Sequence, residues 1–174
     1  MADTPQTLVL NRHRDLEGRR REPHARRAVL ALIALVPVLA LLNVFGQRPQ
    51  TATASSPAAS LAVYAPTHLR GGLIYSARFH IDARQDMKDA TLVLDPSWAE
   101  GYTVNGVAPQ PLKEGSRDGK IVYSFGHLAA GHTLLFFLSL QVNPTNVGRR
   151  SQDVALYDGH TLLVSVERTV TIYP

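Results

Sequence analysis

The stretch that decides the fold is Thr133–Val142, which reads TLLFFLSLQV. Every second position in it carries a large apolar side chain, and these positions are Leu134, Phe136, Leu138, Leu140 and Val142. Successive side chains of a β-strand point to opposite faces of the sheet. The period of two therefore predicts a strand with one face in the core and the other toward water.

The same period recurs on both sides of this stretch, in Leu73–Ile81, Leu92–Leu94, Ile121–Phe125 and Leu162–Ile172, where Arg168 interrupts it. The runs are separated by turn signals at Gly71-Gly72, Asn105-Gly106, Asp118-Gly119, Gly126 to Gly131 and Asp158-Gly159. The last of these is the strongest signal for a β-hairpin. We expect about seven or eight short strands in residues 61–174, forming a mainly β, antiparallel sandwich. An antiparallel barrel is the alternative.

A second type of segment precedes the strands. Ala28–Phe45 reads AVLALIALVPVLALLNVF and holds no charged residue. As a helix it would be roughly 27 Å long, close to the thickness of a bilayer's hydrocarbon core. It predicts one transmembrane helix over residues 28–46, with Leu30, Leu35, Pro37, Leu42 and Asn43 as anchor residues. A cleaved signal peptide with the site Ala52-Thr53-Ala54, or a buried helix of a soluble protein, is the alternative.

The charges flanking this helix predict its orientation. Residues 1–27 hold seven arginines, whereas the first twenty residues beyond the helix hold only Arg48. Segments rich in Lys and Arg next to a transmembrane helix usually stay on the cytoplasmic side of the membrane. We therefore expect a disordered cytoplasmic tail over 1–27 and a body outside the cytoplasmic membrane. Residues 47–60, rich in Ser, Thr, Ala and Pro, predict a flexible stalk. Because the body is nearly neutral, the expected partner is the lipid bilayer and not nucleic acid.

The order of motifs in the body resembles a known family. Asp95-Pro96-Ser97-Trp98 stands before Gly101, and Gly126–His132 (GHLAAGH) leads into the long strand. This order is similar to that of the bacterial immunoglobulin-like domains of surface proteins, in which a G-x-L-x-x-G corner enters the penultimate strand. The resemblance implies an Ig-like β-sandwich that acts as a spacer or binding module. In composition, the chain also resembles small membrane proteins of high-GC actinobacteria.

Few residues suggest chemistry. The chain has no cysteine and none of the common nucleophile, phosphate-binding or zinc-protease motifs, so we expect no catalytic residue, metal or cofactor. Five histidines outside the predicted helix and its tail are interpreted as solvated, and they are His68, His80, His127, His132 and His160. The acids Asp82, Asp86, Asp89 and Asp95 lack calcium-loop spacing and are interpreted as an ordinary charged segment.

Three residues are candidates for binding a partner. Trp98 lies in a loop bounded by proline and glycine, and Arg149-Arg150 follow Gly148. Tryptophan is enriched at binding hot spots, and the arginines suit an acidic partner. We therefore expect a non-catalytic domain that binds or scaffolds an envelope component or a polytopic membrane protein. The alternative is an envelope hydrolase in which Glu100, Glu114 and Asp118 converge.

Overall fold

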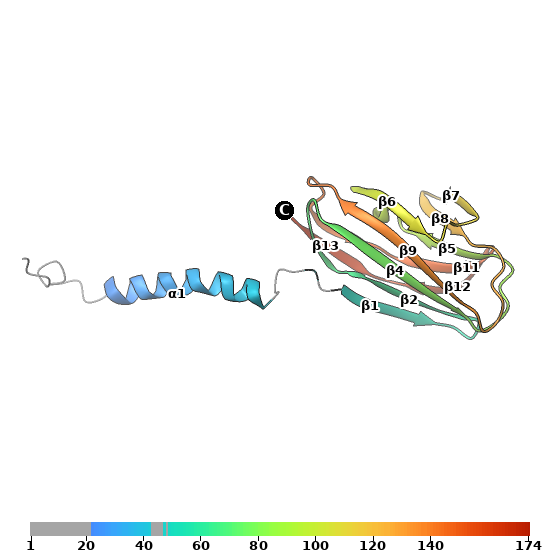
Figure 1. Ribbon diagram of the computed structural model, residues 1–174, viewed down its shortest axis with the longest axis horizontal. Coiled ribbons are helices and arrows are strands. Elements are labelled where there is room, and N and C mark those ends of the chain that lie inside the picture. Colours follow the sequence, from blue (N-terminus) through green and yellow to red (C-terminus); the bar gives the residue numbers. More distant parts are fainter. Residues whose placement is uncertain (1–21, 43–46, 48) are drawn as a thin grey trace, which may run out of the picture. The chain divides into compact units, whose positions relative to one another are not determined.

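The computed structural model describes residues 22–42, 47 and 49–174 (Figure 1). The chain forms two compact units, Met1–Phe45 and Gly46–Pro174. The first unit contains the single helix described in it, and the second contains all the strands.

The helix α1 (Glu22–Leu41) is long and apolar enough to cross a membrane, judged by length and composition. Pro37 lies inside it without ending it. The helix starts at Glu22 and not at Ala28, so the expectation of a disordered tail is wrong for residues 22–27. Pro23 fits there because proline is tolerated in the first turn of a helix. Residues 1–21 and 43–46, which include the predicted anchor residue Asn43, lie outside the described residues.

The second unit is built from three sheets. The first has the strand order β1 (Pro49–Ser55), β2 (Ala59–Pro66), β4 (Ile74–Ala83), β9 (Thr133–Val142), β6 (Tyr102–Ala108). The second has the order β12 (Thr161–Val166), β11 (Val154–Asp158), β5 (Ala90–Leu94), β8 (Lys120–Ser124), β7 (Lys113–Arg117). The third has the order β10 (Gly148–Ser151), β13 (Thr169–Tyr173), β3 (His68–Arg70). All neighbouring strands are antiparallel except β13 and β3, which are parallel.

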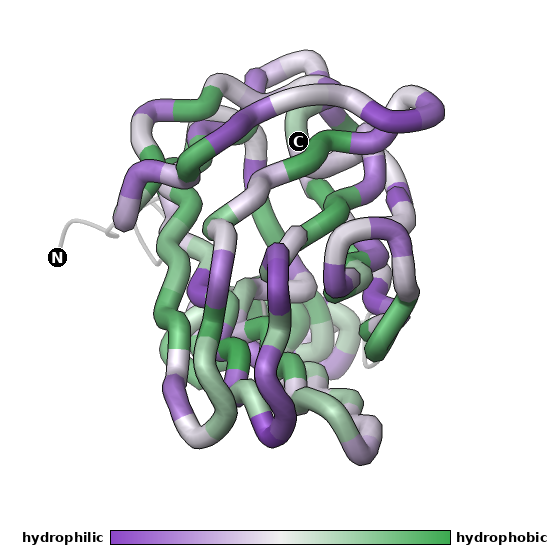
Figure 2. Tube along the Cα trace, turned by 90° about the vertical axis from the view of Figure 1, so that its right-hand side faces the viewer, coloured by the Kyte–Doolittle hydropathy of each residue, from purple (hydrophilic) through white to green (hydrophobic). Residues whose placement is uncertain are grey.

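The core lies between the sheets, and the period-two faces point into it. In β4 the buried residues are Tyr75, Ala77, Phe79 and Ile81, and in β9 they are Phe136, Leu138, Leu140 and Val142. Figure 2 shows how apolar and polar residues alternate along the strands. The expected mainly β, antiparallel sandwich is confirmed, including the predicted inward face of the longest strand.

Two turns confirm their sequence signals. Arg117 pairs with Lys120 across Asp118 (φ 52°) and Gly119 (φ 76°), so both central residues of this hairpin have positive φ. Gly and Asp tolerate that conformation better than most residues, which is why the Asp-Gly pair favours this turn. The turn at Asp158-Gly159 joins β11 to β12 in the same antiparallel manner.

Two expectations about the strands are wrong. The described residues form thirteen strands, and twelve of them, β2 to β13, lie where seven or eight were expected, because short edge strands such as β7 and β10 bury few side chains and leave no apolar period. The predicted flexible stalk over 47–60 contains β1, which pairs with β2 from Pro49–Pro66 to Ser55–Ser60. A strand of small residues can form there because its hydrogen bonds to β2 use only backbone groups, and Ala52 and Ala54 pack against the core.

Candidate functional site

The three-stranded sheet presents a face that no other sheet covers. Along β3 and β13, Leu69, Val170 and Ile172 are buried, so their neighbours in sequence point away from the core. Besides Ser151 and Thr169, the outward residues are His68, Arg70, Arg149, Thr171 and Tyr173, and we call these last five residues the basic sheet face.

The strand register brings these residues together from distant parts of the sequence. Arg149 of β10 lies opposite Thr171 of β13, which lies opposite His68 of β3. Tyr173 lies opposite Arg70 on the same side. The His68 ring stacks on the Tyr173 ring, with centroids 6.1 Å apart and planes 11° from parallel. Strand backbones hold all five residues, so the surface is fixed in shape.

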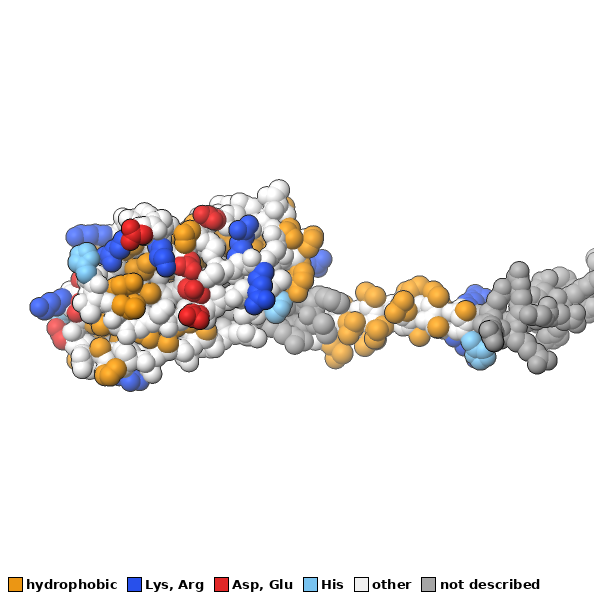
Figure 3. All heavy atoms as spheres, turned by 180° about the vertical axis from the view of Figure 1, so that it is seen from behind, with side chains coloured by type: hydrophobic (Ala, Val, Ile, Leu, Met, Phe, Trp, Pro, Cys, Tyr) orange, Lys and Arg blue, Asp and Glu red, His pale blue; other side chains and the backbone are white. Residues whose placement is uncertain are grey.

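The basic sheet face carries the positive charge of Arg70 and Arg149, and Asp95 adjoins it, because the Ser151 hydroxyl of β10 donates a hydrogen bond of 3.0 Å to the Asp95 carboxylate. Neither β3, β10 nor β13 contains Asp or Glu. Among the described residues, neither Arg70 nor Arg149 forms an ion pair, and both are exposed. Figure 3 shows Lys or Arg and His side chains at both ends of the face in view, with Asp or Glu side chains between them. An exposed arginine in this setting can donate several hydrogen bonds to a phosphate or carboxylate.

Arg150 does not belong to this surface, although it adjoins Arg149 in sequence. It points to the other side of β10, and its Nε donates to Asn146 Oδ1 at 2.8 Å. The buried Asn146 in turn donates to the Gly101 carbonyl oxygen at 3.1 Å. Arg150 therefore holds a loop in place on the other side of β10 from Arg149, and the binding of a partner by the two arginines stays a prediction.

Trp98 is not an exposed anchor. Its side chain is 0% exposed and packs against Phe79, with ring centroids 5.3 Å apart. The Arg168 guanidinium lies over the indole at 5.0 Å, and its Nη2 donates to the carbonyl oxygens of Ala65 and Pro66 at 3.3 and 2.9 Å. The expected role of Trp98 in binding a partner is therefore wrong. The loop folds inward because burying an indole is strongly favourable.

The acidic residues that cluster in sequence separate in space. Asp82 accepts hydrogen bonds from Thr133 and Ser60 at 2.7 and 3.1 Å, and lies 3.1 Å from His80 Nε2. The Thr133 hydroxyl, followed by Ser60 and His80, lowers the pKa of this carboxyl. Asp86 pairs with His127 at 2.9 Å, Asp89 with Ser124 at 2.6 Å, and Asp95 with Lys120 at 3.0 Å. Within the described part of the chain, no group of three or more such side chains could hold a metal.

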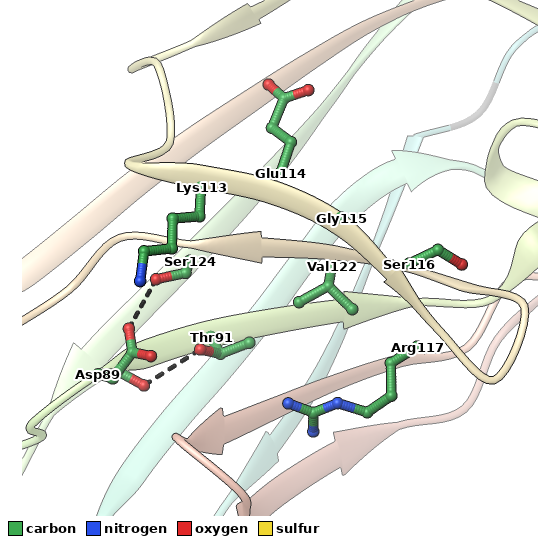
Figure 4. A pocket seen from close by; sticks show the side chains of 9 residues that line it. All are labelled: Asp89, Thr91, Lys113, Glu114, Gly115, Ser116, Arg117, Val122 and Ser124. Carbon is green, nitrogen blue, oxygen red and sulfur yellow. Dashed lines mark hydrogen bonds between the residues drawn. The ribbon is translucent and has the colours of Figure 1, made fainter.

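A shallow cleft of about 210 Å³ lies over β5, β7 and β8, and Figure 4 shows its lining. The Ser124 hydroxyl donates to Asp89 there, and Glu114 points away from both. Neither Glu100 nor Asp118 lines this cleft, and no histidine does. The three carboxyls proposed for a hydrolase therefore do not meet in this cleft.

Comparison with models of protein families finds no match, and comparison with curated protein sequences finds none. Several solved structures are distantly similar. CaCohA2 from Clostridium acetobutylicum shares 15% identity with a TM-score of 0.41, over 65% of this chain and 89% of that one. A non-cellulosomal cohesin from Archaeoglobus fulgidus shares 14% identity with a TM-score of 0.38, over 73% and 92%. The C-terminal domain of wzt shares 15% identity with a TM-score of 0.43, over 74% and 81%.

Proposed function

We propose that this chain is a single-pass membrane protein that presents an Ig-like β-sandwich outside the cytoplasmic membrane. The domain binds or scaffolds an envelope or membrane partner and performs no catalysis of its own. The observation that carries this proposal is α1, which over Pro23–Leu41 is long and apolar enough to cross a membrane. A helix that is apolar on all sides is stable in lipid, where no protein needs to cover it.

The structure of β1 supports an anchor that is not cleaved. The candidate signal-peptidase site Ala52-Thr53-Ala54 lies inside β1. Cleavage after Ala54 would remove all of β1 except Ser55, together with its ladder to β2. It would also leave β2 as an unpaired edge strand and remove Ala52 and Ala54, which pack against the core. A signal peptidase normally cuts in an extended segment before the folded domain, and β1 is part of that domain.

The orientation rests on the arginine asymmetry. Seven arginines precede α1 or lie in its first turns, and Arg48 alone follows within the next stretch. This asymmetry supports an N-terminus in the cytoplasm and a β-sandwich outside. The basic sheet face supports a binding role, because arginine and tyrosine on a rigid sheet are typical of interaction surfaces. The resemblance to bacterial immunoglobulin-like domains is in keeping with such a role.

The test is membrane fractionation of the full chain, with tags at both ends. We expect the chain in the pellet after carbonate extraction, at its uncleaved mass. Protease added to spheroplasts should remove the C-terminal tag and spare the N-terminal tag. Leu35→Arg should shift the chain out of the membrane, since a mid-helix arginine costs about 2.5–3.5 kcal/mol, whereas the control Leu35→Phe should not. A wild-type chain that is soluble without detergent, or that lacks α1, would contradict the proposal.

A further inference from the structure

The chain joins the β-sandwich next to the basic sheet face. Pro49, the first residue of β1, pairs with Pro66, the last residue of β2. Thr67 then leads directly into β3, and its carbonyl oxygen accepts a hydrogen bond of 2.8 Å from the Thr171 N–H of β13. Whatever connects α1 to the domain is therefore attached beside two of the three strands that carry the basic sheet face.

Covalent geometry limits how far this attachment can be from α1. Residues 42–48 separate Leu41 from Pro49. A fully extended chain spans at most about 3.3–3.6 Å per residue, so this separation is below roughly 30 Å whatever the conformation. If α1 spans the bilayer, the start of β1 stays within that distance of the lipid headgroups. The attachment point beside the basic sheet face then stays within that distance of the membrane surface.

The surroundings of the basic sheet face suit the interface of a bilayer. Ile74 at the start of β4 is 58% exposed, Val147 before β10 is 47% exposed, and Tyr173 is 45% exposed. A Cβ added to Gly71 would lie 3.1 Å from the backbone of Pro144, so the turn before Ile74 packs closely against the loop that carries Val147. Cations beside exposed aliphatic side chains and a tyrosine are the combination that favours headgroup depth.

We propose that the basic sheet face docks onto anionic lipid headgroups of the membrane that holds α1, with Arg70 and Arg149 bound to headgroup phosphates. The proposal rests on the proposed function, because it needs α1 in the bilayer. Two exposed arginines attract a free partner only weakly. The tether, however, makes contact with the lipid an intramolecular event at high effective concentration, so a weak surface is sufficient. This argument favours lipid over a soluble acidic protein or polymer.

The experiment uses the full chain in nanodiscs, and the absence of cysteine allows single labelling sites. Ile74→Cys carries an environment-sensitive fluorophore near the basic sheet face. His160→Cys carries it at the opposite end of the domain, where the Gly159 N–H donates to the Asp89 carbonyl oxygen beyond the far end of β4. Nanodiscs contain phosphatidylcholine alone or mixed with phosphatidylglycerol, with a quencher on a fraction of the headgroups. Co-purification with the nanodisc is measured first, as the readout for α1.

With phosphatidylglycerol present, we expect strong quenching at position 74 and little at position 160. Salt should reduce the quenching at position 74, because exposed charges are screened. Arg70→Gln with Arg149→Gln should abolish it. The matched control, Lys88→Gln with Lys113→Gln, also removes two exposed cations and should leave it unchanged.

Equal quenching at the two positions would overturn the proposal, and so would quenching at position 74 that ignores phosphatidylglycerol or survives the loss of both arginines. In each of these outcomes the chain is in the nanodisc, so the proposed anchor stands. A chain that does not co-purify with the nanodisc would instead overturn the proposed function, and the docking with it.

Discussion

Two regions of the β-sandwich combine arginine with aromatic rings, and they differ in almost every other respect. In the first, Arg168 is 8% exposed and lies over Trp98, with Tyr75 and Tyr102 nearby. We call these four residues the buried corner. In the second, the basic sheet face, Arg70 and Arg149 are exposed beside Tyr173. The comparison shows that the same residue types occur in a buried setting and in an exposed one, so their burial must be known before a role is proposed for them.

The buried corner keeps a charge inside the protein by unusual means. Two backbone carbonyl oxygens and the face of an indole surround the Arg168 guanidinium, and no carboxylate of the described residues pairs with it. Burial lowers the pKa of Arg168 from its high ordinary value, although a guanidinium stays charged at neutral pH. Among the described residues, Arg168 Nη1, Trp98 Nε1 and the Tyr75 hydroxyl are buried without a hydrogen-bond partner. Arg168 is therefore inaccessible to a ligand.

The largest expected effect comes from breaking the buried corner. Trp98→Ala should reduce the free energy of unfolding by about 3–5 kcal/mol, because it removes a fully buried ring and leaves a cavity between Phe79 and Arg168. Urea unfolding of the full chain in detergent, followed by far-UV circular dichroism, measures it. The conservative control Trp98→Phe should reduce the free energy of unfolding by less. A loss for Trp98→Ala within the range of a surface substitution, about 0.5 kcal/mol, would show that the indole is not buried in solution.

A second prediction concerns pH and the tyrosines of the buried corner. Burial raises the pKa of Tyr75 far above its ordinary value near 10. Above that ordinary value the unfolded chain loses the phenol proton while the folded chain keeps it. Stability should therefore be fully present below about pH 10 and decline as pH rises further toward the folded pKa. Tyr75→Phe should make this alkaline decline shallower, measured as urea midpoints against pH. If stability declines equally steeply in Tyr75→Phe, the phenol of Tyr75 does not cause the alkaline decline.

The smallest effects are expected at the neighbouring arginines of β10. Arg149→Ala should change the free energy of unfolding by less than about 0.5 kcal/mol, since its side chain is exposed and unpaired among the described residues. Arg150→Ala should cost about 1 kcal/mol through the lost hydrogen bond to Asn146. Thermal unfolding of the two variants side by side measures the difference. The reverse order would mean that the register of β10 against β13 is shifted by one residue.

The sequence predicted the parts of the fold that depend on apolar periodicity. The inward faces of β4 and β9 and the hairpin at Asp158-Gly159 are confirmed, because each follows from local pattern alone. The edge strands β1 and β7 were missed, since an edge strand needs backbone pairing but few buried side chains. A polar segment such as β1 looks like a stalk until its partner strand is known.

The candidate site was only partly predictable. Arg149 was identified from its local charge, but His68 and Arg70 join it through the parallel pairing of β3 with β13, which no local pattern reveals. Trp98 was misplaced because a tryptophan beside Pro96 and Gly101 has the same local sequence whether the loop opens outward or folds inward. Arg168 offered one usable signal, a charge that interrupts an apolar period, which often marks a buried and hydrogen-bonded side chain.

The place of β1 in the chain has a mechanical consequence. Any tension between a membrane anchor and something that holds the far end of the domain enters the β-sandwich at Pro49 and runs along the axis of β1. Antiparallel ladder bonds lie perpendicular to the strands, so this pull shears the whole β1–β2 ladder at once and does not open it bond by bond. Tension applied sideways at Pro49 would instead peel β1 from that end. The domain should accordingly resist stretching along β1 much better than tearing across it.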